Sequence, residues 1–330
     1  MAGVQDSALV IAASNAGALG SLPCAMLSPT QIRSELTAIR GGTDQPYNVN
    51  FFCHTPPQAS TPREALWRET LLPYYREFGI DPATITTGSQ RQPFSDDLAD
   101  LLEEFRPPVV SFHFGMPAPQ LLARVKAWGA VVLSSATTLD EAVWLEAHGA
   151  DAIIAQGLEA GGHRGIFLSD DLSTQVGTMA LLPQIVARVR VPVIAAGGIA
   201  DASGVKAAMA LGAAGVQVGT SYLLAHEART SAVHRAALKG GDAVHTALTN
   251  LFTGRPARGI VNRVMRELGP ISAQAPAFPL AGGAIAPLRA HAEAQQSGAF
   301  SPLWAGQNTS GCMERSAAEI TAGLVSALPS

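Results

Sequence analysis

The feature that most constrains the fold is a regular alternation of short apolar runs and helix-like segments between residues 109 and 218. The apolar runs span residues 109–114, 130–134, 150–155, 191–196 and 214–218. The segments between them have helical periodicity, and several end at a glycine, as at Gly129, Gly149 and Gly212. Short apolar runs separated by helices are typical of parallel strands buried on both faces.

Two further apolar runs, residues 19–22 and 47–53, precede this stretch. Seven or eight strand–helix units within about 225 residues favour an α/β fold of the TIM (β/α)8 barrel type over an open sheet. Residues 1–4 would be the remnant of a truncated first strand. In such a barrel the functional loops follow the carboxyl ends of the strands.

The regular pattern ends near residue 225. The helices expected after this point span residues 226–268, with a break at residues 253–259, and residues 287–296 and 314–328. We therefore expect a cofactor-binding barrel over residues 1–225 and a helical cap that covers the substrate over residues 226–310. A C-terminal helix within residues 311–330 would return to the barrel.

Charge and cysteine content argue against several classes of partner. The 330-residue chain has a formal net charge of −4 and no run of Lys or Arg, so nucleic acid is not an expected partner. Three widely spaced cysteines without metal-ligand spacing favour a reducing cytoplasm, with no zinc site and no disulfide. The apolar run over residues 8–22 is too short and too interrupted for a membrane span, and no signal peptide is expected.

A glycine-rich loop, QGLEAGGHRG over residues 156–165, directly follows the apolar run 150–155. It contains four glycines and one imidazole, His163. A strand that ends in a glycine loop with one titratable group is a common layout of α/β active sites. The alternative is a surface loop with an incidental histidine.

Two glycine turns follow the last two expected strands, at Gly197-Gly198 and Gly219-Thr220. Backbone N–H groups at such turns form an anion-binding nest, and phosphate groups commonly bind after the last two strands of a barrel. Neither turn matches a known phosphate-binding signature, so simple tight turns remain the alternative.

Three amides, Asn50, Gln156 and Gln217, interrupt otherwise apolar strands. A buried amide without a partner costs about 1–3 kcal/mol, so each needs a hydrogen-bond partner. A flat heterocycle such as a flavin ring is one candidate, and pairing with each other or with the backbone is the other.

Two histidines, His113 and His163, would open on the same barrel face, where a near-neutral imidazole can accept a proton or bind an anion. Glu159 could orient His163 or face solvent. The remaining histidines are expected at the surface or behind the site: His54, His148, His226, His234, His245 and His291.

Five ordered motifs carry a resemblance to a known family. They are QGLEAGGHRG (156–165), PVIAAGGI (192–199), GVQVGT (215–220), SFHFG (111–115) and LWAGQ (303–307). Together they resemble nitronate monooxygenase, formerly called 2-nitropropane dioxygenase. The resemblance implies an FMN-dependent TIM barrel that oxidises alkyl nitronates, such as propionate 3-nitronate, with O2 to a carbonyl compound and nitrite.

Carried over by position, the resemblance implies that His163 is the catalytic histidine and that His113 and Phe278 line the substrate pocket. The FMN contacts it implies are Met1, Ala2, Asn50, Gln156, Gly161, Gly162, Gly197, Gly198, Gln217, Val218, Gly219, Thr220 and Gln307. No metal is implied, and a monomer or homodimer is expected. Gly282, Gly283 and Ala286 stand where relatives have larger residues, so the substrate could be larger or less polar than a simple nitronate.

Met1-Ala-Gly-Val4 matches only the turn that follows the family's first strand, which leads us to expect an open barrel seam and weak FMN retention. Two other functions remain open. The first is an FMN-dependent NAD(P)H reductase of enoyl-acyl-carrier-protein or quinone, and the second is a flavin-binding protein without turnover.

Overall fold

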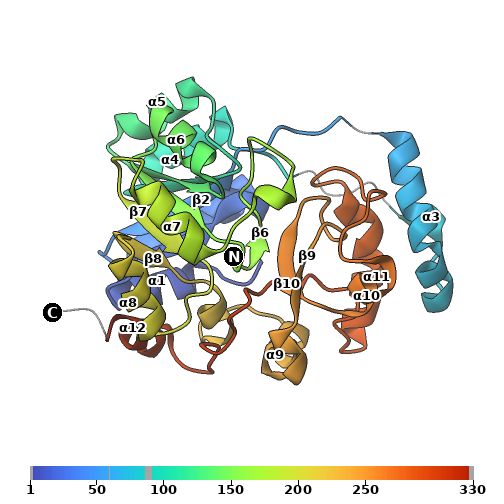
Figure 1. The fold of residues 1–330 in the computed structure, drawn as a ribbon. Coiled ribbons are helices and arrows are strands. Elements are labelled where there is room, and N and C mark those ends of the chain that lie inside the picture. The colour runs from blue at the N-terminus through green and yellow to red at the C-terminus, as the bar shows by residue number, and fades with distance from the viewer. Residues whose placement is uncertain (1–2, 59, 86–90, 327–330) are drawn as a thin grey trace.

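The computed structural model describes residues 3–58, 60–85 and 91–326, and its main body is a curled half-barrel of seven parallel strands (Figure 1). Their order in the sheet is β1-β2-β3-β4-β5-β7-β8. The strands are β1 (Gly20–Pro23), β2 (Tyr47–Phe52), β3 (Val109–His113), β4 (Val131–Ala136), β5 (Ala152–Gln156), β7 (Val193–Ala196) and β8 (Gly215–Gln217). The expected α/β barrel-type fold is thereby confirmed.

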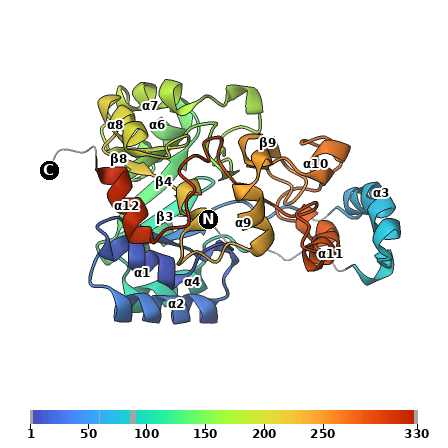
Figure 2. The same ribbon diagram turned by 90° about the horizontal axis from the view of Figure 1, so that it is seen from below.

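Helices cover the outer face of this sheet (Figure 2). They are α1 (Ser7–Asn15), α2 (Pro29–Gly42), α4 (Asp96–Phe105), α5 (Pro119–Ala127), α6 (Leu139–Ala147), α7 (Thr178–Val186) and α8 (Ala202–Ala210). In β2, Val49 and Phe51 belong to the core packed against the helices, whereas Asn48 and Asn50 line the interior. This alternation follows from the two-residue period of a strand. It directs the polar side chains into the half-barrel.

The sheet is open between β1 and β8, which do not pair within the described part of the chain. Helix α1 and the C-terminal helix α12 (Ala317–Val325) pack against each other at this seam through Leu9, Ile320 and Leu324. No strand of this sheet precedes α1 among the described residues. Gly3 and Val4 are not in a strand, and Met1 and Ala2 lie outside the described residues.

A second lobe covers the carboxyl ends of the strands, and it contains strands as well as helices (Figure 1). Its antiparallel sheet, in the order β6-β10-β9, consists of β6 (Gly162–His163), β10 (Ala257–Ile260) and β9 (Thr246–Thr249). Its helices are α3 (Thr61–Phe78), α9 (Ala232–Lys239), α10 (Arg263–Leu268) and α11 (Ala281–Ala294). The prediction of helices on either side of a break at residues 253–259 is therefore wrong, because β9 lies in a stretch predicted to be helical and β10 begins within the predicted break.

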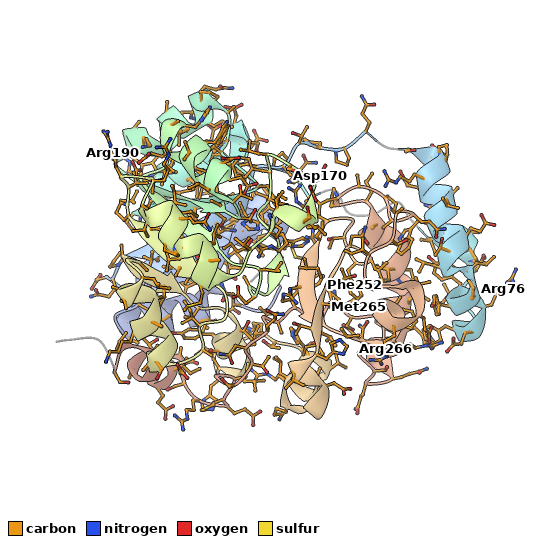
Figure 3. The ribbon with its side chains drawn as sticks, viewed as in Figure 1. Arg76, Asp170, Arg190, Phe252, Met265 and Arg266 are labelled. Atoms are coloured by element: carbon orange, nitrogen blue, oxygen red, sulfur yellow. The ribbon has the colours of Figure 1, made fainter. Side chains whose placement is uncertain are left out.

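Helix α3 belongs spatially to this cap, although it lies far from the rest of the cap in sequence. The indole Nε1 of Trp67 donates to the carbonyl of Ala281 at 3.2 Å, and the hydroxyl of Tyr75 donates to that of Ala284 at 2.6 Å. Phe252 and Met265, a residue of α10, lie inside the cap (Figure 3). No helix among the described residues is long and apolar enough to cross a bilayer.

Candidate active site

A cavity of about 720 Å³ occupies the interior of the half-barrel and reaches the open seam. Most of the predicted site residues line it. These are Asn50, His113, Gln156, Gly161, Gly162, His163, Gly197, Gly198, Gln217, Val218, Gly219 and Thr220. The register explains the convergence, because Gln156 pairs with Ala196 and Ala196 with Gln217 at the ends of three adjacent strands. Pockets of this size are typical of small-ligand and cofactor sites.

The glycine loop is held by two side chains that bond to its backbone. The amide of Gln156 accepts from the N–H of Gly165 at 2.7 Å and donates to the carbonyl of His163 at 2.9 Å. The fully buried guanidinium of Arg164 donates to the carbonyls of Gln156 and Gly157, both at 2.7 Å, and to the side chain of Gln175 at 3.0 Å. For the Gln156 amide, the hydrogen-bond partners are therefore backbone groups, which was one of the two possibilities considered for the amides in the strands.

The same loop is also part of the cap. Gly162 and His163 form β6, which pairs with β10 in the register His163 to Ala257. The backbone of His163 therefore has a fixed position between the barrel and the cap. Gly161 is required at this crossing, because a Cβ there would lie 2.5 Å from the backbone nitrogen of Gly306.

The imidazole of His163 is oriented by Thr253, whose hydroxyl lies 2.9 Å from Nε2. Nδ1 has no partner among the described residues, and His163 lines the cavity. Nε2 of His113 lies 3.2 Å from the carbonyl of His163. Since a carbonyl can only accept, His113 carries its proton on Nε2. Glu159 does not orient His163, because its carboxylate accepts from the backbone and hydroxyl of Thr178 at the start of α7.

Three phenylalanine rings, Phe52, Phe114 and Phe278, pack around the histidines. The Phe278 ring centre lies 5.4 Å from that of His163 and 4.8 Å from that of His54. His54 was expected either at the surface or behind the site. It is only 5% exposed, so it lies behind the site and not at the surface. His54 follows β2, and its packing against a residue more than 200 positions away leaves no local signal in the sequence.

The electrostatic environment of this cluster is cationic. Burial and then the neighbouring Arg91, His113 and Arg255 hold the pKa of His163 well below its usual range. Burial lowers the pKa of His113 to about 4. Both imidazoles are therefore neutral near pH 7, and the surrounding positive charge favours an anionic ligand.

The two glycine turns have the properties of an anion nest. Gly197 and Gly198 have positive φ angles of 121° and 73°, which a glycine adopts without strain. Among the described residues, none accepts from the backbone N–H groups of Gly198, Gly219 or Thr220. A Cβ on Gly219 would meet no atom within 4 Å, so the turn is open. These features fit the phosphate of a bound cofactor.

The inner face of β2 offers a second polar feature. Asn50 Oδ1 accepts from the hydroxyl of Ser111 at 2.7 Å, and Asn48 donates to the same hydroxyl at 2.8 Å. The Oδ1 atom of Asn48 is buried without a donor among the described residues. Together with the cavity volume, this unsatisfied acceptor fits a heterocycle that carries N–H groups.

Several predicted residues lie elsewhere. Gln307 is exposed and does not line the cavity, although its backbone N–H donates to the carbonyl of Glu159 at 3.0 Å. Gly282, Gly283 and Ala286 lie in α11 and do not line the cavity either. The predicted contacts of Met1 and Ala2 fall outside the described residues.

Sequence reasoning missed Arg91, Arg164, Thr253 and Arg255. The arginine in the glycine loop was visible as part of the motif, but nothing in the sequence indicates that its guanidinium turns inward. Thr253 and Arg255 lie in the predicted break between cap helices, residues 253–259, and in the structure they lie between β9 and β10. Nothing in that break indicates that its side chains reach His163 and Ile166.

The chain matches a family model described as nitronate monooxygenase over residues 1–327. It is 42% identical to a nitronate monooxygenase from Pseudomonas aeruginosa, covering 99% of this chain and 94% of that protein. It is 40% identical to a nitronate monooxygenase from Paraburkholderia phytofirmans, covering 98% and 89%.

Two solved structures are similar to the fold. A nitroalkane oxidase from Streptomyces ansochromogenes has a TM-score of 0.90 and 35% identity, covering 99% of this chain and 93% of that one. FabK from Thermotoga maritima has a TM-score of 0.70 and 26% identity, covering 99% and 90%.

Proposed function

Because the chain belongs to the nitronate monooxygenase family, we propose that it oxidises alkyl nitronates with O2 to a carbonyl compound and nitrite, using FMN. The observation that carries this proposal is the convergence of His163 and the unpartnered N–H groups of Gly198, Gly219 and Thr220 on one cavity. A cofactor phosphate at the turns and a substrate at His163 would share that cavity.

The residues that would hold FMN follow from the cavity lining. The N–H groups of Gly198, Gly219 and Thr220 would bind its phosphate, and the polar inner face of β2 and the Gln217 side chain would face its ring. When bound, FMN supplies the electron acceptor that the protein side chains lack. Gln156 would act through the loop it holds, since both ends of its amide are already bonded to that loop.

His163 would contact the substrate through Nδ1. The Thr253 hydroxyl lies 3.4 Å from the carbonyl of Arg255, and when it donates there it accepts from Nε2–H of His163. This arrangement leaves the Nδ1 lone pair free to accept a proton or a hydrogen bond. A neutral imidazole surrounded by cations favours the anionic nitronate over a neutral nitroalkane.

The test is nitrite release. Protein loaded with FMN is mixed with propionate 3-nitronate in air, and nitrite is measured against a His163→Ala variant. We expect nitrite from the wild type and a rate reduced roughly 100-fold or more in the variant, the range that general acid–base groups contribute. Full activity of His163→Ala would remove the assigned role of His163.

Because the fold is also similar to that of FabK, a second experiment tests the reductase alternative. In that experiment the FMN-loaded protein is mixed with NAD(P)H without oxygen. Rapid bleaching of the flavin combined with no nitrite from nitronates would favour a reductase. Bound flavin with no turnover of either donor would favour a flavin-binding protein.

A further inference from the structure

The guanidinium of Arg91 lines the cavity, and beyond its contribution to the positive charge around His163 it has no assigned contact in the function proposed above. Its Cζ lies 5.4 Å from the ring centre of Phe278. Among the described residues, the Arg91 side chain makes no hydrogen bond or ion pair, and only its backbone carbonyl is engaged, 3.0 Å from Nε2 of His54. A partly desolvated guanidinium without an acceptor is costly, so it is suited to an anion delivered by a ligand.

The other inward-facing guanidiniums near the site differ in this respect. Arg164 and Arg258 donate to backbone carbonyls. Arg255 donates to the carbonyl of Ile166 and lies 4.1 Å over the ring of Phe114, outside the cavity lining. Among the described residues, Arg91 is therefore the arginine that lines the cavity.

The carboxylates of Glu159, which lines the cavity, and of Glu141 are engaged elsewhere. Glu159 bonds to Thr178, and Glu141 accepts from the backbone and hydroxyl of Thr137 and from the backbone of Phe167. Neither is available to neutralise Arg91. Arg91 therefore has no carboxylate partner among the described residues.

The position of Arg91 relative to His163 defines what that ligand would be. The His163 ring centre and the Arg91 Cζ each lie 5.4 Å from the ring centre of Phe278. Arg91 and His163 both line the cavity, whereas the predicted pocket residue Phe278 packs behind them and does not line it, so one ligand in the cavity can contact both Arg91 and His163. We propose that Arg91 is a specificity-determining residue that binds a carboxylate at the far end of the nitronate substrate. The planar guanidinium matches a carboxylate with two parallel hydrogen bonds, which Lys cannot reproduce. This inference rests on the proposed function.

The experiment compares two substrates of the same length. Propionate 3-nitronate carries the carboxylate, and propyl 1-nitronate has a methyl group in its place. In Arg91→Met we expect KM for propionate 3-nitronate to rise roughly 10- to 100-fold, the effect of losing one or two charge-assisted hydrogen bonds. KM for propyl 1-nitronate should change little. Arg91→Lys should recover part of the loss, and Arg190→Met, on the outer side of the barrel, is the matched control (Figure 3).

An equal loss on both substrates, or no loss on either, would overturn the inference while leaving the proposed function intact. Binding of succinate, a dianion of similar length, is measured in parallel by calorimetry on the FMN-loaded protein. If the wild type turns over neither nitronate, the proposed function fails. Weaker succinate binding in Arg91→Met would then still support the anion site, and unchanged binding would refute it.

Discussion

Replacing Arg164 with methionine tests whether the glycine loop depends on one buried guanidinium. Arg164 is 0% exposed and donates to the carbonyls of Gln156 and Gly157 and to Gln175. Methionine keeps much of the apolar volume but leaves these three acceptors without their donor. At about 1–3 kcal/mol for each unsatisfied buried group, and with partial relaxation, the expected destabilisation is about 3–6 kcal/mol. That is a large fraction of the roughly 5–15 kcal/mol that stabilises a typical protein.

The assay is urea unfolding followed by tryptophan fluorescence and far-UV circular dichroism. The midpoint should fall markedly in Arg164→Met, partly in Arg164→Lys, and hardly in the exposed control Arg190→Met. FMN affinity should fall with it, because the loop leads into His163 and β6. A destabilisation below about 1 kcal/mol would refute the reasoning, since it would mean that the three acceptors find other partners at little cost.

Two further predictions concern the pH dependence of stability and the lack of space for a side chain at Gly161. Burial lowers the pKa of His113 to about 4, whereas an unfolded histidine titrates near 6.5. Stability should therefore be complete above about pH 6.5 and fall by up to about 3 kcal/mol between pH 6.5 and 4 from this residue. Urea midpoints at pH 7 and pH 5 should differ less in His113→Gln, and a flat wild-type profile would contradict the assignment. Gly161→Ala, with its Cβ 2.5 Å from the Gly306 nitrogen, should weaken FMN binding, measured by fluorescence titration. Gly41→Ala, where a Cβ meets nothing within 4 Å, should bind FMN like the wild type. Equal FMN affinities in the wild type, Gly161→Ala and Gly41→Ala would contradict the close approach of Gly161 to the Gly306 backbone.

The barrel could be predicted because its signals are local. Each buried parallel strand is a short apolar run, and each is bounded by a helix or a glycine turn. The same periodicity placed Gln156, Gly198 and Gln217 at strand ends. The parallel register then brings those ends to one edge of the sheet.

The cap could not be predicted in the same way. β9 and β10 have four residues each, and β10 contains Arg258 and Gly259, so neither resembles an apolar strand. They exist because β10 pairs on both sides, with β6 of the glycine loop and with β9. Such long-range pairing leaves little mark on a single segment of sequence.

The buried cations were missed for a related reason. The sequence shows Arg91, Arg164 and Arg255 as ordinary charged residues, which are usually exposed. Their inward direction depends on acceptors and aromatic rings supplied by distant segments, such as the Phe114 ring beneath Arg255. Only the assembled fold shows that the cavity near His163 is cationic.

The most direct test of the central claim is anaerobic mixing of the FMN-loaded protein with propionate 3-nitronate in a stopped-flow spectrometer. The proposed site predicts a rapid change in the flavin absorbance on mixing, and a change slowed roughly 100-fold or more in His163→Ala. An unchanged flavin spectrum with the nitronate, together with rapid bleaching by NAD(P)H, would contradict nitronate oxidation as the function of this site.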